Sequence, residues 1–263
     1  MTCIEDECER SGLYSNSASN TKYSPHPCPL PKGEGERVVS FSLREKVPKG
    51  RMRGFTLAEV LITLGIIGVV AALTIPTLIS NNNKRIVETR LQKFYSIMQN
   101  AVKLSEVDNG SHLKWDKITL NGEATKSWFE KYLQPYLKTT SVSNDDIGVI
   151  AEFPDGSLVY ISYYAVTFYP KSKDADYENI GACQMGKSCF IFNFYPGLQN
   201  GHSADDAKYI LGKGFVPYKF RWDGTENALY NHSPYGCNNM GQYCTSLIEY
   251  NAWKIPEDYP FKF

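Results

Sequence analysis

The stretch "RGFTLAEVLITLGIIGVVAALTIPTLIS" (residues 53–80) decides the fold of this 263-residue chain. Between residues 55 and 80 it holds one charged residue, Glu59. At the helical rise of about 1.5 Å per residue, this run would extend roughly 39 Å, which is enough to cross the hydrocarbon core of a bilayer with some tilt. We therefore expect a membrane-spanning helix that ends near Ser80.

Basic residues flank the apolar run on both sides, and the nearer and denser group precedes it. They are Lys46, Lys49, Arg51 and Arg53 before the run, and Lys84 and Arg85 after it. The positive-inside rule keeps the more basic flank in the cytoplasm. We therefore expect a single-pass membrane protein, with a cytoplasmic N-terminus and an extracytoplasmic globular head over residues 108–263.

The first 54 residues differ in composition from the rest of the chain. They include "SPHPCPLPKGEGER" (residues 24–37), which is rich in proline, glycine and charge and has neither a helical nor a strand period. We expect no packed structure over residues 1–54 and interpret them as a disordered leader. The same segment is similar to peptides that arise when bacterial intergenic repeats are read as protein, which would make residues 1–51 a start-site error upstream of Met52. A genuine disordered N-terminal region is the alternative.

The residues "GFTLAEVLITLGIIGVVAALTIP" (residues 54–76) resemble the N-terminus of type IV pilins and type II secretion pseudopilins. The resemblance rests on Gly54, Phe55, Glu59, Gly65, Gly68 and Pro76. It implies a prepilin peptidase that cuts after Gly54 and methylates the new amine of Phe55. It also implies a filament made of copies of the chain or of other pilin-like subunits, assembled by an inner-membrane platform and its ATPase.

The resemblance also gives Glu59 a role. A carboxylate in hydrocarbon costs a few kcal/mol unless it meets a partner. In this family the implied partner is the new N-terminal ammonium of an adjacent subunit, so Glu59 would set the register during assembly. The alternative is that Glu59 merely extends toward the lipid headgroups from the start of the helix.

Composition limits the partners of the chain. Its 28 basic and 28 acidic residues balance, which argues against a general electrostatic grip on nucleic acid. Removal of residues 1–54 would leave 19 basic and 21 acidic residues, a formal net charge of −2, and four of the seven cysteines. We therefore expect the membrane and other proteins as partners, and no nucleic acid.

The four cysteines beyond residue 54 form two close pairs in the sequence. They are Cys183 with Cys189, and Cys237 with Cys244. In an oxidising compartment an even set predicts two disulfides, and we favour local pairing among the three connectivities that four cysteines allow. A zinc site that adds His202 or His232 is the alternative, but the CxxC spacing typical of zinc sites is absent.

Small and apolar residues continue beyond the span at spacings of four and three. They are Val87, Leu91, Phe94, Met98, Ala101 and Ser105. This period predicts an amphipathic helix that packs onto the head. Its solvent-facing sides would carry Arg85, Glu88, Arg90, Gln92 and Lys93. We expect one long helix over residues 55–107, softened at Pro76 because proline removes a backbone donor.

The head combines a short helix with strands. Residues 124–138 place aromatic side chains on one side of a helix, which predicts core packing rather than a ligand site. Residues 148–164 hold two β-rich runs joined by a Pro-Asp-Gly turn, which predicts a hairpin, and residues 189–195 and 215–224 supply further strands. The fold class is therefore α+β and pilin-like: a long N-terminal helix, half transmembrane and half amphipathic, packed on a small antiparallel β-sheet head.

The head has no recognisable catalytic motif. His112, His202 and His232 lie in no G-x-S-x-G or H-E-x-x-H setting. Some pseudopilins hold calcium in a late loop of the head, and the matching region has Asp205 and Asp206 but lacks a clear Asp-x-Asn-Gly pattern. We expect no enzymatic activity, no cofactor and no metal.

Aromatic residues crowd the C-terminus. They are Tyr250, Trp253, Tyr259, Phe261 and Phe263. We favour closure of the core over the last disulfide, with an exposed binding patch as the alternative. The interpretation of the whole chain is a structural filament subunit. The alternatives are a minor pilin-like module that displays its head to bind a surface, a secreted substrate or DNA, and a membrane-anchored enzyme.

Overall fold

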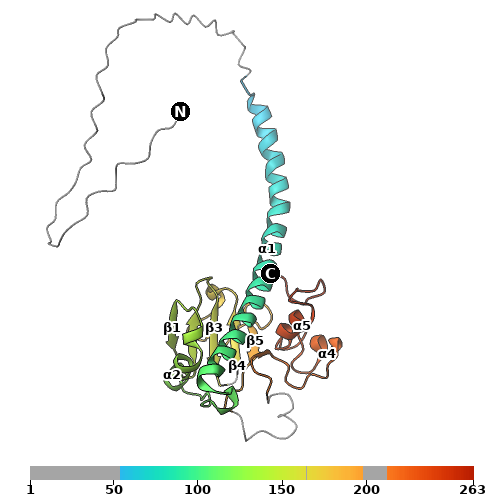
Figure 1. Cartoon of the computed structure of the whole chain (residues 1–263). Helices are drawn as coiled ribbons and strands as arrows, with labels where there is room; N and C mark the ends of the chain where they lie inside the picture. The colour runs from blue at the N-terminus through green and yellow to red at the C-terminus, as the bar shows by residue number, and fades with distance from the viewer. Residues whose placement is uncertain (1–53, 164, 198–211) are drawn as a thin grey trace, which may run out of the picture. The chain divides into compact units, whose positions relative to one another are not determined.

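The computed structural model describes residues 54–163, 165–197 and 212–263. The chain divides into two units, residues 1–54 and 55–263, and the expected leader lies outside the described residues except for Gly54. The second unit consists of a long helix, α1 (Leu57–Asn109), and a head built around an antiparallel sheet (Figure 1). The predicted α+β class is confirmed.

Helix α1 is 53 residues long and forms a single continuous element. It runs through Pro76 without interruption, so this residue removes one backbone donor and does not end the helix. The helix stops at Gly110, whose φ of 74° suits glycine. The predicted start and end of the helix are each within two residues of those observed.

The head follows α1 and combines short helical elements with six strands. Its helical elements are η1 (His112–Lys114), α2 (Gly122–Tyr132), η2 (Gln134–Tyr136), η3 (Ser172–Asp174), α4 (Glu226–Asn231) and α5 (Cys244–Tyr250). Its strands are β1 (Ser141–Asn144), β2 (Val149–Glu152), β3 (Leu158–Ser162), β4 (Ala165–Tyr169), β5 (Phe190–Asn193) and β6 (Val216–Pro217). They pair in sequence order, each antiparallel to the next.

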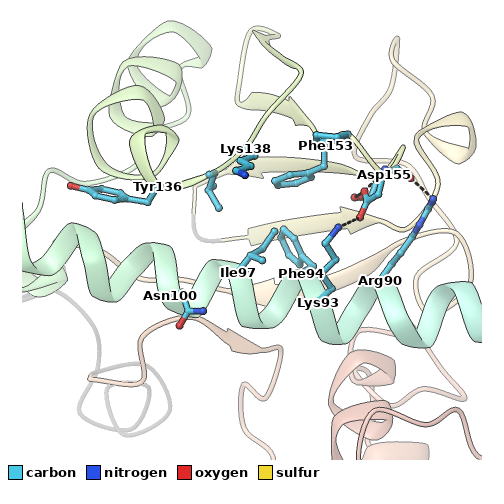
Figure 2. Close-up of a pocket in the computed structure, with 12 residues that line it drawn as sticks. Arg90, Lys93, Phe94, Ile97, Asn100, Tyr136, Lys138, Phe153 and Asp155 are labelled. Carbon is cyan, nitrogen blue, oxygen red and sulfur yellow. Dashed lines mark hydrogen bonds and ion pairs between the residues drawn. The ribbon is translucent and has the colours of Figure 1, made fainter. Parts of the chain in front are cut away.

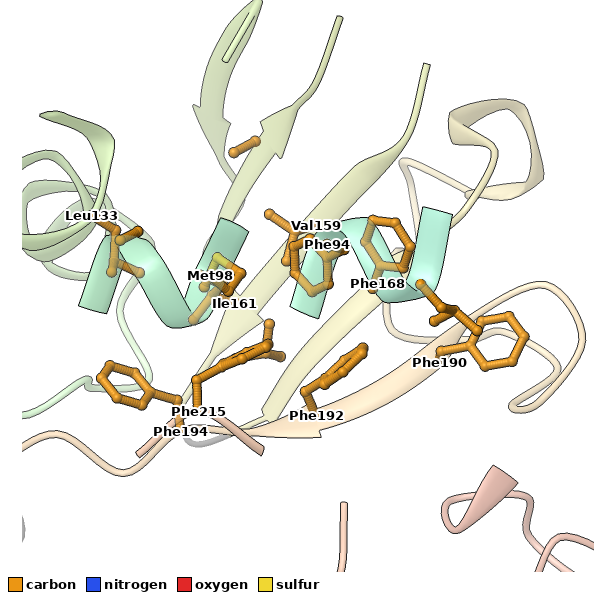
Figure 3. Packing of buried hydrophobic residues seen from close by; sticks show 14 of the residues in the cluster. Phe94, Met98, Leu133, Val159, Ile161, Phe168, Phe190, Phe192, Phe194 and Phe215 are labelled. Carbon is orange, nitrogen blue, oxygen red and sulfur yellow. The ribbon is translucent and has the colours of Figure 1, made fainter. Parts of the chain in front are cut away.

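The second half of α1 packs on this sheet through Phe94 (Figure 3). Its ring stacks on Phe168 of β4, with centroids 4.1 Å apart, and meets Phe153, Phe192 and Phe215 edge on. Such aromatic pairs contribute about 0.5 to 1.5 kcal/mol beyond the area they bury. Because every predicted stripe residue from Val87 to Ser105 is buried, the helix period is confirmed.

The aromatic face of α2 also packs in the core, as predicted. Trp128, Phe129 and Tyr132 are buried on α2. Tyr132 stacks on Trp115, with ring centroids 4.6 Å apart, and its hydroxyl donates to the carboxylate of Asp116 at 2.9 Å. These side chains fix the α2 segment against the end of α1.

The strand predictions need two corrections. The hairpin is present as β2 and β3, but it is flanked by two strands that were not predicted, β1 beside β2 and β4 beside β3. The expected strand over residues 215–224 is reduced to Val216 and Pro217. Because Pro217 has no N–H to donate to a ladder, it limits the strand, and the chain turns away soon afterwards at Arg221, where φ is 60°.

Glu88 was predicted to face solvent, and this prediction is wrong. It is 7% exposed, and its carboxylate accepts hydrogen bonds from Nζ of Lys254 and the backbone N–H of Ile255, each at 3.0 Å. The C-terminal segment therefore covers the flank of α1 that carries this residue. Tyr95 and Trp253 pack beside the contact, with ring centroids 5.0 Å apart.

The C-terminal aromatic residues close the core. Tyr259 is buried and donates a hydrogen bond to the carbonyl oxygen of Gly186 at 2.6 Å. Phe263 stacks on Tyr259, with centroids 5.9 Å apart, and Trp253 and Phe261 pack against the core from partly buried positions. Tyr250 differs from these residues, since half of its surface is exposed.

Candidate functional site

The first turn of α1 holds Glu59 in a capping box. The Thr56 hydroxyl accepts from the backbone N–H of Glu59 at 3.2 Å. In return, Oε2 of Glu59 accepts from the backbone N–H and the hydroxyl of Thr56, at 2.8 and 2.9 Å. This reciprocal arrangement satisfies two of the free donors at a helix N-terminus. Its sequence signal, Thr-x-x-Glu before an apolar run, is present, but Thr56 was not predicted as a site residue.

The apolar half of α1 is exposed along its whole length in the isolated chain. The large exposed side chains are Phe55, Leu57, Val60, Leu61, Ile62, Leu64, Ile66, Ile67, Val69, Val70, Leu73, Ile75, Leu78 and Ile79. An apolar surface of this extent far exceeds what a soluble monomer exposes. The helix is long and apolar enough to cross a membrane, and no part of its most apolar window is buried in the chain.

Two threonines in this half of the helix donate hydrogen bonds back to the helix itself. Thr63 donates to the carbonyl oxygen of Val60, and Thr74 donates to that of Val70, both at 3.0 Å. Within hydrocarbon, an unsatisfied hydroxyl would be costly, and local bonds of this kind avoid that cost. The half therefore suits a lipid environment apart from its carboxylate.

The two glycines of this half have no packing role within the subunit. A Cβ atom added at Gly65 or Gly68 would meet no heavy atom within 4 Å. The head therefore does not require glycine at either position. Any steric reason for glycine must come from a molecule that packs on this half, or from the backbone freedom that glycine gives a helix.

The head is fixed to α1 by cations that bridge to the β2–β3 turn (Figure 2). Arg90 donates to the carbonyl oxygens of Asp155 and Pro170, and Lys93 pairs with the Asp155 carboxylate at 2.7 Å. Partial burial acts to raise the pKa of Asp155, but the hydrogen bonds from Lys93 and Ser157 outweigh it and lower the pKa. This bridge was not predicted, because its partners lie 62 to 80 residues apart in the sequence.

A cavity of about 500 Å³ lies beside this bridge (Figure 2). Its wall contains Phe94, Ile97 and Phe153, and Lys138 reaches it from the segment after η2. The cavity combines an apolar wall with cationic side chains. Its lining contains no histidine or cysteine, and the Ser157 hydroxyl there donates a hydrogen bond to the Asp155 carboxylate at 2.6 Å.

Both cysteine pairs form local disulfides, Cys183 with Cys189 and Cys237 with Cys244. Their Cα atoms lie 6.1 and 4.7 Å apart, within the usual range for such bonds. The two loops pack on each other, because a Cβ added at Gly186 would come within 2.3 Å of the Cys244 sulfur. All four cysteines of the described residues are therefore bonded in these two disulfides.

The histidines and acids do not gather into a site within the described residues. His112 bonds Glu106 at 2.7 Å, and His232 stacks on Tyr235. Across residues 54–163, 165–197 and 212–263, no three His, Cys, Asp or Glu side chains are arranged to hold a metal ion. The other predicted candidates, His202, Asp205 and Asp206, lie outside the described residues.

Comparison with known families shows to which family the chain belongs. Residues 77–263, which include the head and the second half of α1, match a family of unknown function (DUF6613). The chain belongs to this family. Residues 49–75 match the prokaryotic N-terminal methylation motif, which spans Gly54, Phe55 and Glu59. No curated protein and no solved structure matches the chain significantly.

The chain is therefore a type IV pilin-like protein with the motif that prepilin peptidase processes. The motif and the one apolar helix of membrane-spanning length in the described residues indicate a membrane-anchored, single-pass subunit that assembles with other pilins. Pilin-like proteins are structural. Within this family member, the apolar half of α1 and Glu59 form the candidate assembly site.

Proposed function

We propose that the chain is a structural subunit of a type IV pilus-like or type II secretion pseudopilus filament. Prepilin peptidase would cut between Gly54 and Phe55 and methylate the new amine. The mature chain would stand in the inner membrane with its head outside the cytoplasm, and a platform protein with its ATPase would move it into the filament. No enzymatic activity and no cofactor is needed for this role.

The observation that carries this proposal is the exposed apolar half of α1. A single span surrounded by lipid would need only to be apolar, and it would gain nothing from a carboxylate near one end. A helix that moves from lipid into a bundle of like helices needs an apolar surface together with a feature that fixes its register. Glu59 is the one charge available for that purpose in residues 55–80.

The capping box leaves Glu59 ready for a second partner. Both hydrogen bonds from Thr56 go to Oε2, and no hydrogen bond from the described residues reaches Oε1. In the proposed filament, Oε1 accepts from the methylated ammonium of Phe55 on a neighbouring subunit. Each of these two charges is costly to bury alone, and pairing them would compensate both costs.

The test uses two substitutions of Glu59 in cells that make the filament. Glu59→Gln retains the capping box, because glutamine serves at this helix position as well as glutamate does, but it removes the charge. Glu59→Val removes both the capping box and the charge. We expect both variants to be membrane-inserted and cleaved to a chain that starts at Phe55, and to be depleted from the sheared filament fraction at least tenfold.

The matched control is Thr63→Val, which removes a polar group from the same half of α1 without changing its charge. It should enter filaments normally. Normal incorporation of Glu59→Gln would sink the register role. An intact mass that shows an uncut Gly54–Phe55 bond in the wild-type protein would contradict processing by prepilin peptidase. It would therefore also contradict the proposed assembly into a filament.

The cavity beside Arg90 and Lys93 favours a second candidate function. A filament tip subunit that captures an anionic partner would need an accessible hollow with free cations, and Lys138 is exposed there without an ion pair among the described residues. The ratio of this chain to the major subunit in sheared filaments separates the roles. A tip subunit would be present in a few copies for each filament.

A further inference from the structure

Cationic side chains gather on the head at the point where α1 leaves its apolar half. Lys171, Lys173 and Lys187 line hollows against this part of α1, and Lys84 and Arg85 follow the apolar run on the helix itself. Lys171 donates from Nζ to the side-chain oxygen of Asn83 at 2.7 Å. Segments far apart in the sequence thus meet on one face, which we call the basal face.

Two shallow hollows define the basal face. Asn83, Lys171 and Lys187 line one of them, which extends to the Cys183–Cys189 loop. Ile86, Lys171 and Lys173 line the other. Lys171 belongs to both hollows, so the lysines of the β4–η3 segment and of the disulfide loop lie around the same two turns of α1.

The basal face lies within reach of the bilayer surface. Asn83 follows the last residue of the apolar run, Ser80, by only about 4.5 Å along the helix axis, and Ile86 follows it by about 9 Å. Charges in solution interact over about 8 Å at physiological ionic strength. With the span ending at Ser80, the lysines that line hollows against Asn83 and Ile86 would lie close to the lipid phosphates.

Acidic groups lie near this face, but within the described residues no ion pair joins them to its cations. Asp174 lines one of the hollows, whereas Glu88 and Asp155 are already paired with Lys254 and Lys93. Within the described part of the chain, Lys84, Arg85, Lys173 and Lys187 form no ion pair. A set of unpaired cations next to a membrane span is the arrangement that attracts anionic lipid.

We propose that the basal face binds anionic phospholipid headgroups and so holds the head against the bilayer. The inference rests on the membrane span and on the charges around its end. It does not depend on the direction of insertion or on filament assembly. Entry into a filament would then require these contacts to break.

The test places the full-length chain in nanodiscs of POPC alone and of POPC with about one quarter POPG. A water-soluble reagent acetylates accessible lysines, and mass spectrometry measures the rate at each position. We expect labelling of Lys171, Lys173 and Lys187 to slow at least about threefold in the POPG bilayer. The difference should vanish near 1 M salt, where the screening length falls to about 3 Å.

Lys114 and Lys117 serve as internal controls, because they follow the far end of α1, roughly 39 Å along the helix from Asn83. Their labelling should not depend on the lipid. The variant Lys173→Glu with Lys187→Glu should abolish the lipid dependence at Lys171, whereas Lys114→Glu with Lys117→Glu should leave it intact. Equal labelling of the basal lysines in the two bilayers would overturn the proposal, and so would an unchanged lipid dependence in the first variant.

Discussion

Glu88 of α1 accepts a hydrogen bond from the backbone N–H of Ile255, a residue 167 positions later in the chain, at 3.0 Å. The bond is buried, and the Lys254 ammonium completes it from the solvent side. It joins two parts of the head. One is the first turn of α1 that packs in the head, and the other is the C-terminal segment that closes the core. A carboxylate at this position is therefore part of the fold.

Removing this carboxylate should destabilise the head. Glu88→Ala leaves the Ile255 N–H buried without an acceptor, which costs about 2 kcal/mol of unfolding free energy. Glu88→Gln keeps an acceptor oxygen and loses only the charge, so about half of that loss is expected. Denaturant unfolding of the full-length chain in detergent, followed by tryptophan fluorescence, measures both variants. The control is Glu130→Ala, which is exposed on α2 and should shift the free energy by less than about 0.5 kcal/mol.

Phe94 is the residue of α1 whose truncation should cost most. It is 2% exposed and contacts four other rings. We expect Phe94→Ala to lower the unfolding free energy by about 3 to 5 kcal/mol, because it removes buried area and leaves a cavity. Leu104→Ala on the same helix is a matched control, since Leu104 is 54% exposed and should change little. Equal losses in the two variants would mean that the helix does not pack on the sheet as described.

The disulfide between Cys237 and Cys244 should contribute to stability. Cys244→Ser is expected to lower the unfolding free energy by about 2 to 4 kcal/mol. The double variant Cys237→Ser with Cys244→Ser should lose no more than the single one, since both break the same bond. A reductant should destabilise the wild type further than it destabilises the double variant. A melting curve unchanged in Cys244→Ser would contradict the bond.

The head should lose stability above pH 10. Burial, together with the charge of Asp176, raises the pKa of Tyr169 to about 12, and the hydrogen bond to Glu152, together with burial, raises that of Tyr177 to about 12. Both pKa values are 10.0 in the unfolded chain. Between pH 10 and 12 only the unfolded state loses these protons, so the stability present below pH 10 is lost as the pH rises through the folded values.

Denaturation midpoints measured from pH 8 to 12 check this prediction. Absorbance at 295 nm should show late ionisation of these tyrosines in the folded protein. Tyr177→Phe removes one of the shifted groups and should flatten the decline with pH. A midpoint that stays constant to pH 12 would contradict it.

Much of the helical part was predictable because its signals are local. The apolar run, the period that begins at Val87 and the stop near Gly110 all lie within a few residues of what they determine. The Pro-Asp-Gly turn of the first hairpin is equally local. β4 was not separated from β3 because the chain turns at Tyr163, with φ of 54°, and no glycine, proline, asparagine or aspartate announces that turn.

The contacts made at long range could not be read from the sequence. Glu88 sits beside the apolar stripe of α1, and only the later segment around Ile255 makes its burial favourable. The same holds for Arg90, whose partners lie 65 and 80 residues away. The capping box of Thr56 and Glu59 was readable from its spacing. Its hydrogen bonds use the same Glu59 carboxylate to which the resemblance assigns an assembly role.

The bond between Glu88 and Ile255 also imposes an order on biogenesis. A ribosome releases the apolar half of α1 long before it makes the last ten residues, so the span can enter the membrane while the flank of α1 that carries Glu88 is still uncovered. The head reaches its final form only when the end of the chain has followed. A chain that stops short of Ile255 would be anchored in the membrane with an incomplete head. Insertion into the membrane and completion of the head are therefore separate steps.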